Sequence, residues 1–351
     1  MLLLLSVISF LLIFSVVISR IRNDFWLFKV FEYPRLQKIA LIVATLGGWA
    51  YYWPDYTTVH KIFIVALSFC LLYLCYKVFP YTLLAKKEML QVNAADKDNE
   101  VRIFAANVLQ TNTQYAKMLQ QIRACDPDII FLLETNKAWA DGMKELGERY
   151  PYQLLEPLEN TYGLLFYSRL KLGGAKVMYT VKNDIPSIET MVYLPSGKPF
   201  AIWGLHPEPP VPGENRYSTA KDKELMKVAL KVRSCKYPCF VFGDLNDVAW
   251  SYTTELFRKT SGLLDPRRGR GFYSTFSAHH WFVRFPLDYI FCSEHFGLVQ
   301  MKRLPKNGSD HFATFTHLAF HPELKHKQSA PQADATEIEE ARKMAEQTVK
   351  E

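Results

Sequence analysis

Three long runs without a charged side chain, all within the first 80 residues, most constrain how this chain folds. Met1–Ser19 contains only apolar residues and four serines, and Ile39–Trp53 and Ile62–Tyr76 follow it. At about 1.5 Å per residue, a helix over such a run approaches the ~30 Å thickness of a bilayer's hydrocarbon core. The sequence therefore predicts a membrane region over residues 1–90 with about three transmembrane helices, at residues 1–19, 39–54 and 62–79.

Aromatic residues at the ends of the second and third runs agree with membrane interfaces; they are Tyr51, Tyr52, Trp53, Tyr73, Tyr76 and Tyr81. A cleaved signal peptide is the alternative for the first run. That run lacks a basic leader and a small-residue cleavage site before Arg20, so we favour a retained helix.

Positive charge is concentrated in the same N-terminal region. Residues 1–90 carry nine Lys or Arg against four Asp or Glu, which accounts for five of the chain's seven net positive charges. The remainder is close to neutral, which argues against a nucleic-acid-binding surface. Basic residues lie between the first and second runs and after the third, which favours a cytoplasmic C-terminal domain. The amphipathic segment Arg22–Leu36 can lie at either interface, so the membrane side stays open.

After a polar linker over residues 91–100, the pattern changes to short apolar runs that alternate with amphipathic stretches. The expected strands are Val101–Val108, Ile129–Glu134, Tyr162–Ser168, Glu189–Leu194, Phe200–His206, Cys239–Asp244 and Leu287–Phe291. The expected helices are Thr113–Ala124, Trp139–Tyr150, Thr219–Ser234 and Ser251–Ser261. This alternation indicates a layered α/β domain over residues 101–325. Residues 326–351 are polar and are expected to form a solvated tail.

A recurring feature of this domain is an apolar strand followed at once by an acid, amide or imidazole. These residues are Asn107, Glu134, His206, Asp244, Asn246, Asp288, Asp310 and His311. Taken singly, each is explained more simply as a helix cap, a turn former or a surface acid. Strand ends of an α/β sheet meet at one crevice, so the repeated pattern favours a shared site.

The most specific motifs of this domain are GDLN at residues 243–246 and SDHF at 309–312, and LLE, LDYIF and YSR support them. With these motifs the chain resembles the endonuclease/exonuclease/phosphatase superfamily over residues 101–320. The resemblance implies a four-layer αββα (DNase I-like) sandwich. Three spans joined to such a domain also resemble a membrane-bound bacterial branch that includes teicoplanin-resistance proteins linked to lipid pyrophosphate dephosphorylation.

Residue roles follow from this resemblance. It implies that Glu134, with Asn107 and Asp310, binds Mg²⁺ or Mn²⁺, an ion suited to hard oxygen ligands. Asp244 and Asn246 would orient or deprotonate the attacking water. Asp288 would fix the tautomer of His311, which would face the phosphorus. His206 would contact the phosphate or protonate the leaving oxygen. The general base stays open between Asp244 and the Asp288/His311 pair.

Two further segments are predicted to contact substrate. Arg267, Arg268 and Arg270 lie in a basic, aromatic-rich stretch, where guanidinium groups suit a second phosphate; the alternative is that they are simply solvated. Tyr162 is a further predicted substrate contact. The Pro-rich segment 207–212 is expected to form a rigid wall of the pocket or a surface loop.

These features predict a multi-pass protein of the bacterial inner membrane, with a metal-dependent phosphoesterase domain that acts on a phosphate or pyrophosphate ester. Membrane lipids are its expected partners and a polyprenyl pyrophosphate is a candidate substrate. A membrane-tethered nuclease and an inactive membrane scaffold are the two alternatives.

Overall fold

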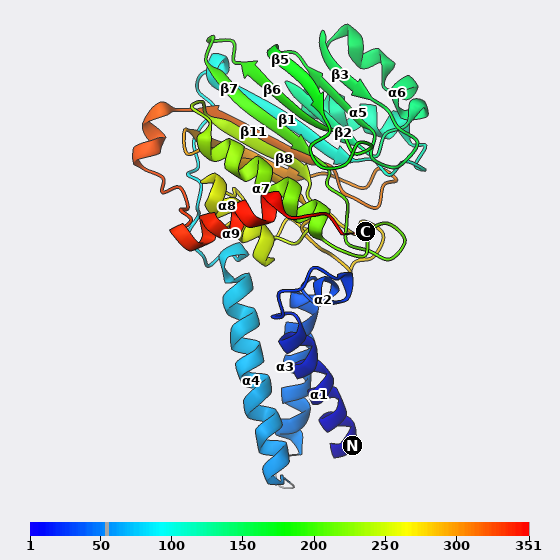
Figure 1. Ribbon diagram of the computed structural model, residues 1–351, viewed down its shortest axis with the longest axis vertical. Helices are drawn as coiled ribbons and strands as arrows, with labels where there is room; N and C mark the ends of the chain where they lie inside the picture. Colours follow the sequence, from blue (N-terminus) through cyan, green and yellow to red (C-terminus); the bar gives the residue numbers. More distant parts are fainter. Residues whose placement is uncertain (53–55, 351) are drawn as a thin grey trace.

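A computed structural model describes residues 1–52 and 56–350 of the chain. Figure 1 shows an α/β domain standing on a bundle of three helices, α1 (Leu2–Ile18), α3 (Arg35–Tyr51) and α4 (Thr58–Val78). The short helix α2 (Trp26–Val30) connects α1 to α3 at the end of the bundle that faces the domain. The bundle is closed by buried apolar side chains that include Leu5, Leu12, Ile42, Trp49, Leu67 and Leu74.

The outside of the bundle is also apolar. Exposed side chains on its three helices include Leu3, Phe10, Leu41, Val65, Phe69 and Leu72. Among the described residues, one helix is long and apolar enough to cross a membrane, over Thr58–Tyr81, and α1 is apolar but shorter. Helix length therefore does not support three transmembrane helices. The end of the second expected span, with Trp53, lies outside the described residues.

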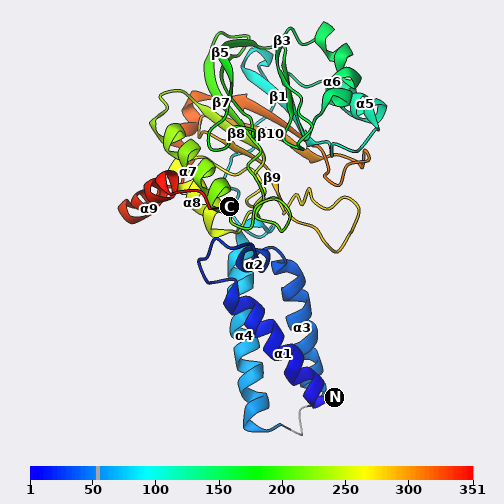
Figure 2. The same cartoon turned by 45° about the vertical axis from the view of Figure 1, so that its right-hand side comes forward.

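The α/β domain contains two mixed sheets, as Figure 2 shows from a second angle. The six-stranded sheet has the order β10-β11-β1-β2-β4-β3, and the five-stranded sheet has the order β5-β6-β7-β8-β9. The first comprises β1 (Glu100–Asn107), β2 (Ile129–Leu133), β3 (Tyr152–Glu156), β4 (Leu164–Ser168), β10 (Phe296–Arg303) and β11 (Thr314–Phe320). The second comprises β5 (Lys171–Met178), β6 (Ser187–Tyr193), β7 (Pro199–Leu205), β8 (Cys239–Asp244) and β9 (Asp288–Cys292).

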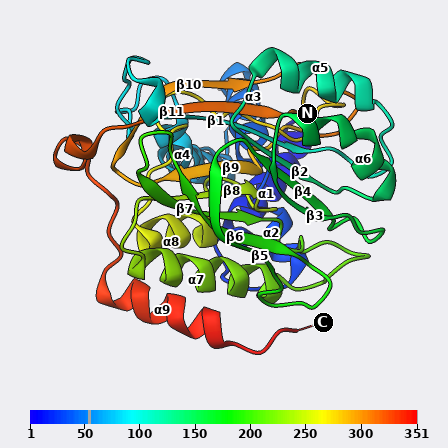
Figure 3. The same ribbon diagram turned by 90° about the horizontal axis from the view of Figure 1, so that it is seen from above.

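Apolar side chains on both faces of the central strands join these sheets to each other and to the helices. On β2, Phe131 packs between the sheets against Phe242 of β8, whereas Ile130 and Leu132 face the other way, toward α5 (Tyr115–Cys125) and α6 (Lys137–Gly142). Helices α7 (Thr219–Ser234) and α8 (Tyr252–Ser261) cover the outer face of the five-stranded sheet. Figure 3 shows this sequence of helices, sheet, sheet and helices. The α/β sandwich expected from the sequence is confirmed.

The C-terminal segment differs from the expected solvated tail. Helix α9 (Ala335–Glu346) lies along α7, and its Ala341 and Ala345 are buried in the same apolar cluster as α7 and α8. Lys259 of α8 pairs with Glu337 at 2.6 Å. The buried residues of α9 are two alanines, whose small side chains give no sign of burial within the polar composition of residues 326–351.

Candidate active site

Strand register brings the predicted polar residues to one end of the sandwich. Asn107 of β1 lies opposite Leu133 of the parallel strand β2, so Glu134 follows beside it. Leu205 of β7 lies opposite Gly243 of β8, which places His206 next to Asp244. Asp244 in turn faces Asp288 across the antiparallel pair β8 and β9. Residues far apart in the sequence therefore meet because their strands are neighbours.

Asn107 links the carboxylates of the two sheets. Its amide Nδ2 donates to Oε1 of Glu134 at 2.7 Å and to Oδ2 of Asp244 at 3.2 Å, and its Oδ1 accepts from the backbone N–H of Leu109. Asn107 thus holds Glu134 and Asp244 together with both ends of its amide engaged. Burial raises the pKa of Glu134, and the nearby Asp310 carboxylate raises it further, while Asn107 and His311 oppose this effect.

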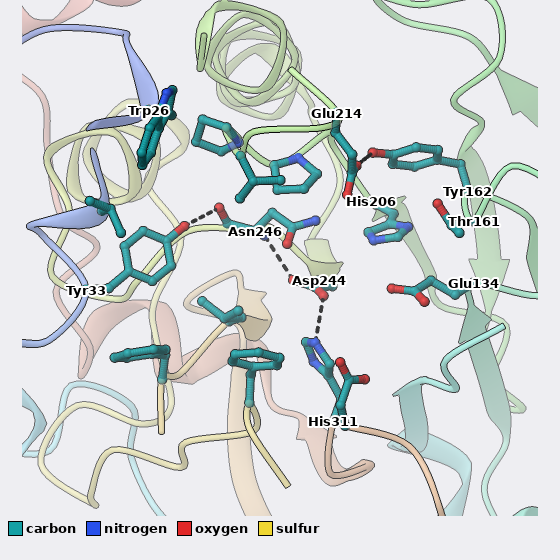
Figure 4. Close-up of a pocket in the computed structure, with 18 of the residues that line it drawn as sticks. Trp26, Tyr33, Glu134, Thr161, Tyr162, His206, Glu214, Asp244, Asn246 and His311 are labelled. Atoms are coloured by element: carbon teal, nitrogen blue, oxygen red, sulfur yellow. Dashed lines mark hydrogen bonds and ion pairs between the residues drawn. The ribbon is translucent and has the colours of Figure 1, made fainter. Parts of the chain in front are cut away.

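His311 is held between two buried carboxylates. Its Nδ1 lies 2.8 Å from Oδ2 of Asp288, which confirms the predicted pairing geometry, and its Nε2 lies 3.5 Å from Oδ2 of Asp244. Burial alone would lower the pKa of His311, but Asp288 and Asp244 together raise it above its usual value. Burial, in turn, raises the pKa of Asp244. Asp288 fixes the ring, so the Nε2 edge of His311 faces Asp244 in the pocket of Figure 4.

His206 stands on the other side of the same pocket as a neutral group. Burial and the neighbouring charge of His311 lower the pKa of His206 to about 3. Its buried Nδ1 has no hydrogen-bond partner among the described residues. The ring packs 5.2 Å from that of Tyr162, whose hydroxyl bonds Glu214. A neutral imidazole in this place can donate one N–H to a substrate oxygen.

The backbone is strained where the polar residues leave their strands. Glu134 and Asn246 adopt φ angles of 58° and 49°, a left-handed conformation that non-glycine residues rarely take. At Gly243 φ is 131°, and a Cβ atom there would lie 2.0 Å from the carbonyl oxygen of Leu205. Gly243 of the GDLN motif is therefore required, because a larger residue would prevent the close approach of β7 and β8 beside His206 and Asp244.

The pocket around these groups is a cavity of about 410 Å³ with one polar side and one apolar side. The polar side carries Glu134, His206, Asp244, Asp310 and His311. The apolar side includes Trp26, Val30, Pro209, Val211, Phe276 and Phe285. Segment 207–212 thus forms a wall, as one of the two sequence interpretations expects.

Three lining residues come from the segment between α1 and α3, and sequence reasoning missed all of them: Trp26, Val30 and Tyr33. The hydroxyl of Tyr33 donates to the backbone oxygen of Asn246 at 2.8 Å, while Asn246 Nδ2 donates to the oxygen of Pro207 at 3.0 Å. The aromatic enrichment of residues 25–33 was the available signal, although it indicated only an interfacial segment.

The three predicted phosphate-binding arginines do not line this pocket, and that prediction is wrong. Arg267 is 1% exposed and its guanidinium pairs with Asp265 at 2.8 Å. Arg268 pairs with Glu255 at 3.2 Å. Arg270 donates to backbone oxygens, one of them that of Met89 at 2.6 Å. Each guanidinium already has partners in the protein, so these arginines stabilise the loop.

The residues present suit a hard divalent cation. The ligand atoms of Asp244, Asp288 and His311 all lie within 4.8 Å of one another, so they could hold a metal ion. In that group, however, Asp288 and His311 already bond each other. Glu134 and Asp310 instead present carboxylates on the same polar side, and their mutual repulsion in a buried setting is what a divalent cation would relieve.

A sandwich of two mixed sheets with carboxylates, amides and a paired histidine at its strand ends defines a class of phosphoester-hydrolysing domains. A sequence profile of the Endonuclease/Exonuclease/phosphatase family matches residues 101–311. The chain belongs to this family, whose members typically hydrolyse phosphoester bonds. A search of curated proteins finds no match to the chain.

Solved structures share the fold at low sequence identity. The human nocturnin catalytic domain with bound sulfate is 19% identical, with a TM-score of 0.53 over 66% of this chain and 97% of that one. D. rerio TDP2 complexed with a single-strand DNA product is 16% identical, with a TM-score of 0.52 over 62% and 98%. A family protein from Bacteroides thetaiotaomicron is 17% identical, with a TM-score of 0.51 over 63% and 98%.

Proposed function

We propose that this protein is a membrane-anchored, metal-dependent phosphoesterase that hydrolyses a lipid-linked phosphate or pyrophosphate, as the teicoplanin-resistance-like branch would. One observation carries the proposal: the segment between two bundle helices supplies part of the apolar side of the candidate pocket. Trp26, Val30 and Tyr33 face the same cavity as Asp244 and His311. An apolar chain and a charged headgroup would thus meet matching sides of one pocket.

The helical bundle is the proposed membrane anchor. Its outer surface is apolar along all three helices, which is unfavourable in water and suits lipid. Thr58–Tyr81 is long enough to span a bilayer, and α1 and α3 would pack beside it within the membrane. We place the bundle in a bacterial inner membrane and leave the side of the catalytic domain open.

Hydrolysis in this pocket requires an attacking water, a base that takes its proton, and groups that neutralise the negative charge of the phosphate. Asp244 and the Asp288/His311 pair stand next to each other, and both are candidates to take the proton of a water that attacks phosphorus. The carboxylates beside His311 raise its pKa and so favour a protonated imidazole, which makes Asp244 the better base. His206 can donate its N–H to a phosphate or leaving oxygen. Glu134 and Asp310 would hold Mg²⁺ or Mn²⁺, with Asn107 fixing Glu134; the bound ion would neutralise phosphate charge.

The test compares three substrates on the full chain in detergent micelles with Mg²⁺. They are a long-chain polyprenyl pyrophosphate, a short-chain water-soluble pyrophosphate ester and single-stranded DNA. We expect Trp26→Ala to lower kcat/KM for the long-chain substrate about tenfold, because one aromatic wall contributes about 1–3 kcal/mol of apolar contact. Hydrolysis of the short ester should change little.

Leu27→Ala is the matched control, because Leu27 lies on the same short helix but is exposed and outside the cavity. Equal losses for both pyrophosphates in Trp26→Ala would contradict the apolar-chain assignment. Preferred cleavage of DNA would favour the nuclease alternative, and no turnover of any substrate would favour the inactive scaffold.

A further inference from the structure

A second cavity, of about 150 Å³, lies where the bundle meets the catalytic domain. It is formed by the end of α1, the start of α3, the end of α4 and the loop before α8, so it is separate from the catalytic pocket. Figure 1 shows these helix ends together at the domain-facing end of the bundle. Four basic side chains line it, and Glu32 is the only acidic lining residue in the part of the chain that the structure describes.

Arg35 is the central observation. It is 3% exposed, and its Nε and Nη1 atoms are buried without any hydrogen-bond partner among the described residues. A buried guanidinium normally pairs with a carboxylate or backbone oxygens, because leaving a charged donor unsatisfied costs several kcal/mol. Glu32 lines the same cavity but is not within ion-pair distance of Arg35 in the described structure.

The other basic side chains of the cavity are Arg20, Arg22 and Lys77. Arg20 lies over the ring of Tyr73, with 4.7 Å between its Cζ and the ring centroid. Neither Arg20 nor Lys77 has a carboxylate within 4.0 Å in the part of the chain that is described. Arg22 bonds Glu340 at 3.3 Å but is mostly exposed. Three basic groups of the cavity, Arg20, Arg35 and Lys77, therefore have no carboxylate within 4.0 Å among the described residues, although Glu32 lies in the same lining.

We infer that this cavity binds a phosphate group, either the headgroup phosphate of an anionic membrane lipid or free inorganic phosphate. The guanidinium of Arg35 would donate from the unpaired Nε and Nη1, with Arg20 and Lys77 adding charge. Basic pockets between membrane helices at the water interface are suited to lipid headgroups. The lipid source rests on the proposed membrane anchoring, whereas the anion site itself does not.

The experiment measures binding to the full chain, purified in a zwitterionic detergent, by native mass spectrometry and thermal unfolding. The probes are dioleoyl phosphatidylglycerol, dioleoyl phosphatidylcholine and inorganic phosphate. We expect one saturable phosphatidylglycerol per chain, a higher Tm on binding, and at least tenfold weaker binding of phosphatidylcholine. Phosphatidylglycerol binding tighter than inorganic phosphate assigns the site to lipid, and the reverse order assigns it to free phosphate.

Arg35→Gln and Arg20→Gln each remove one charge from the cavity, and both should weaken binding at least tenfold. Arg20 is exposed, so its variant keeps the test valid if Arg35→Gln does not fold. Lys61→Gln makes the same charge change on α4 at the opposite end of the bundle and should bind as the wild type does. Wild-type binding by both arginine variants, or the absence of saturable binding of both phosphatidylglycerol and inorganic phosphate to the wild type, would overturn the inference. Hydrolysis is a separate readout, so failure of the proposed activity is distinguishable.

Discussion

At the scale of single residues, the strand-end pattern predicted most of the polar residues that the structure brings together in the candidate pocket. Each polar residue follows an apolar strand, and neighbouring strands in register bring those ends together. The arginines show where this reasoning fails. Sequence gives their charge but not their partners, and Asp265, two residues before Arg267, already satisfies its guanidinium. A charge is available to a ligand only when the fold leaves it unpaired.

Asp288→Asn should lower kcat by about two to four decades while changing KM little, since an acid that orients an imidazole acts mainly in the transition state. The substitution replaces the charged carboxylate that lies 2.8 Å from Nδ1 of His311 with a neutral amide. Steady-state kinetics with a lipid pyrophosphate substrate provide the measurement. A wild-type kcat in a variant with unchanged Tm would show that the pair does not act in turnover.

Glu134→Gln should remove most of the affinity for Mg²⁺, because the amide replaces one charged oxygen ligand with a neutral group. Isothermal titration calorimetry of the full chain with MgCl₂ measures this directly. Asp141→Asn, a change at an exposed acid that pairs with Lys137 at 2.8 Å, is the control and should titrate as the wild type does. If Glu134→Gln retained its affinity for Mg²⁺, we would instead assign the metal site to Asp244, Asp288 and His311.

Arg267→Ala should destabilise the domain by about 3–5 kcal/mol, the usual cost of leaving a buried carboxylate uncompensated. Asp265 and Arg267 are both 1% exposed and pair with each other. Denaturant unfolding followed by circular dichroism gives the free energy of unfolding. Lys306→Ala, at an exposed position, should stay within about 0.5 kcal/mol of the wild type. A stable Arg267→Ala variant with altered substrate choice would restore the binding role.

At the scale of elements, the main strands and the helices that cover the sheets follow from periodicity, but two docked helices do not. Helix α2 has five residues, too few for a periodic signal, and apart from the nearby Tyr33 the other residues that line the pocket lie more than 100 positions away in the sequence. Helix α9 lies in a polar segment, and the two residues that it buries, Ala341 and Ala345, are too small to indicate a docking face. Both depend on tertiary contacts that no local pattern contains.

Ala341→Asp should loosen α9, because it places a charge in the apolar cluster shared with α7 and α8, at a cost of about 2–4 kcal/mol. Limited proteolysis should then remove the C-terminal segment faster, and Tm should fall. Arg342→Asp introduces the same side chain one residue later on the exposed face and should leave cleavage unchanged. Equal cleavage of the two variants would mean that α9 does not dock in solution.

At the scale of the whole molecule, buried polar contacts fix the domain on its bundle. The Trp250 indole N–H donates to the backbone oxygen of Glu32 at 2.9 Å, and the Tyr81 hydroxyl donates to the backbone oxygen of Ala249 at 2.7 Å. Lys29 lies 3.7 Å from Asp222 of α7, which also contacts Lys221. The sequence predicted the two parts of the molecule separately, but gave no sign that their contact forms a wall of the pocket.

Lys29→Met should increase opening of residues 22–34 at neutral pH, measured by hydrogen exchange. Burial raises the pKa of Asp222, but Lys29 and Lys221 lower it more, so the net pKa lies below the usual 3.8. The stability from Asp222 is therefore present above pH 3.8 and is lost as pH falls through the lowered pKa. Acid should open the same residues in the wild type. Unchanged exchange in Lys29→Met at pH 7 would show that this charge pair does not hold α2.

Because Trp26, Val30 and Tyr33 line the pocket, its apolar lining residues and its candidate catalytic residues come partly from different regions of the sequence. Every candidate catalytic side chain lies between residues 107 and 311, whereas three residues that line the same pocket lie before residue 34. Catalytic chemistry and selectivity can therefore change independently. Exchanging only the N-terminal region between relatives would be a direct route to new specificities, because it alters the pocket without touching a reacting group.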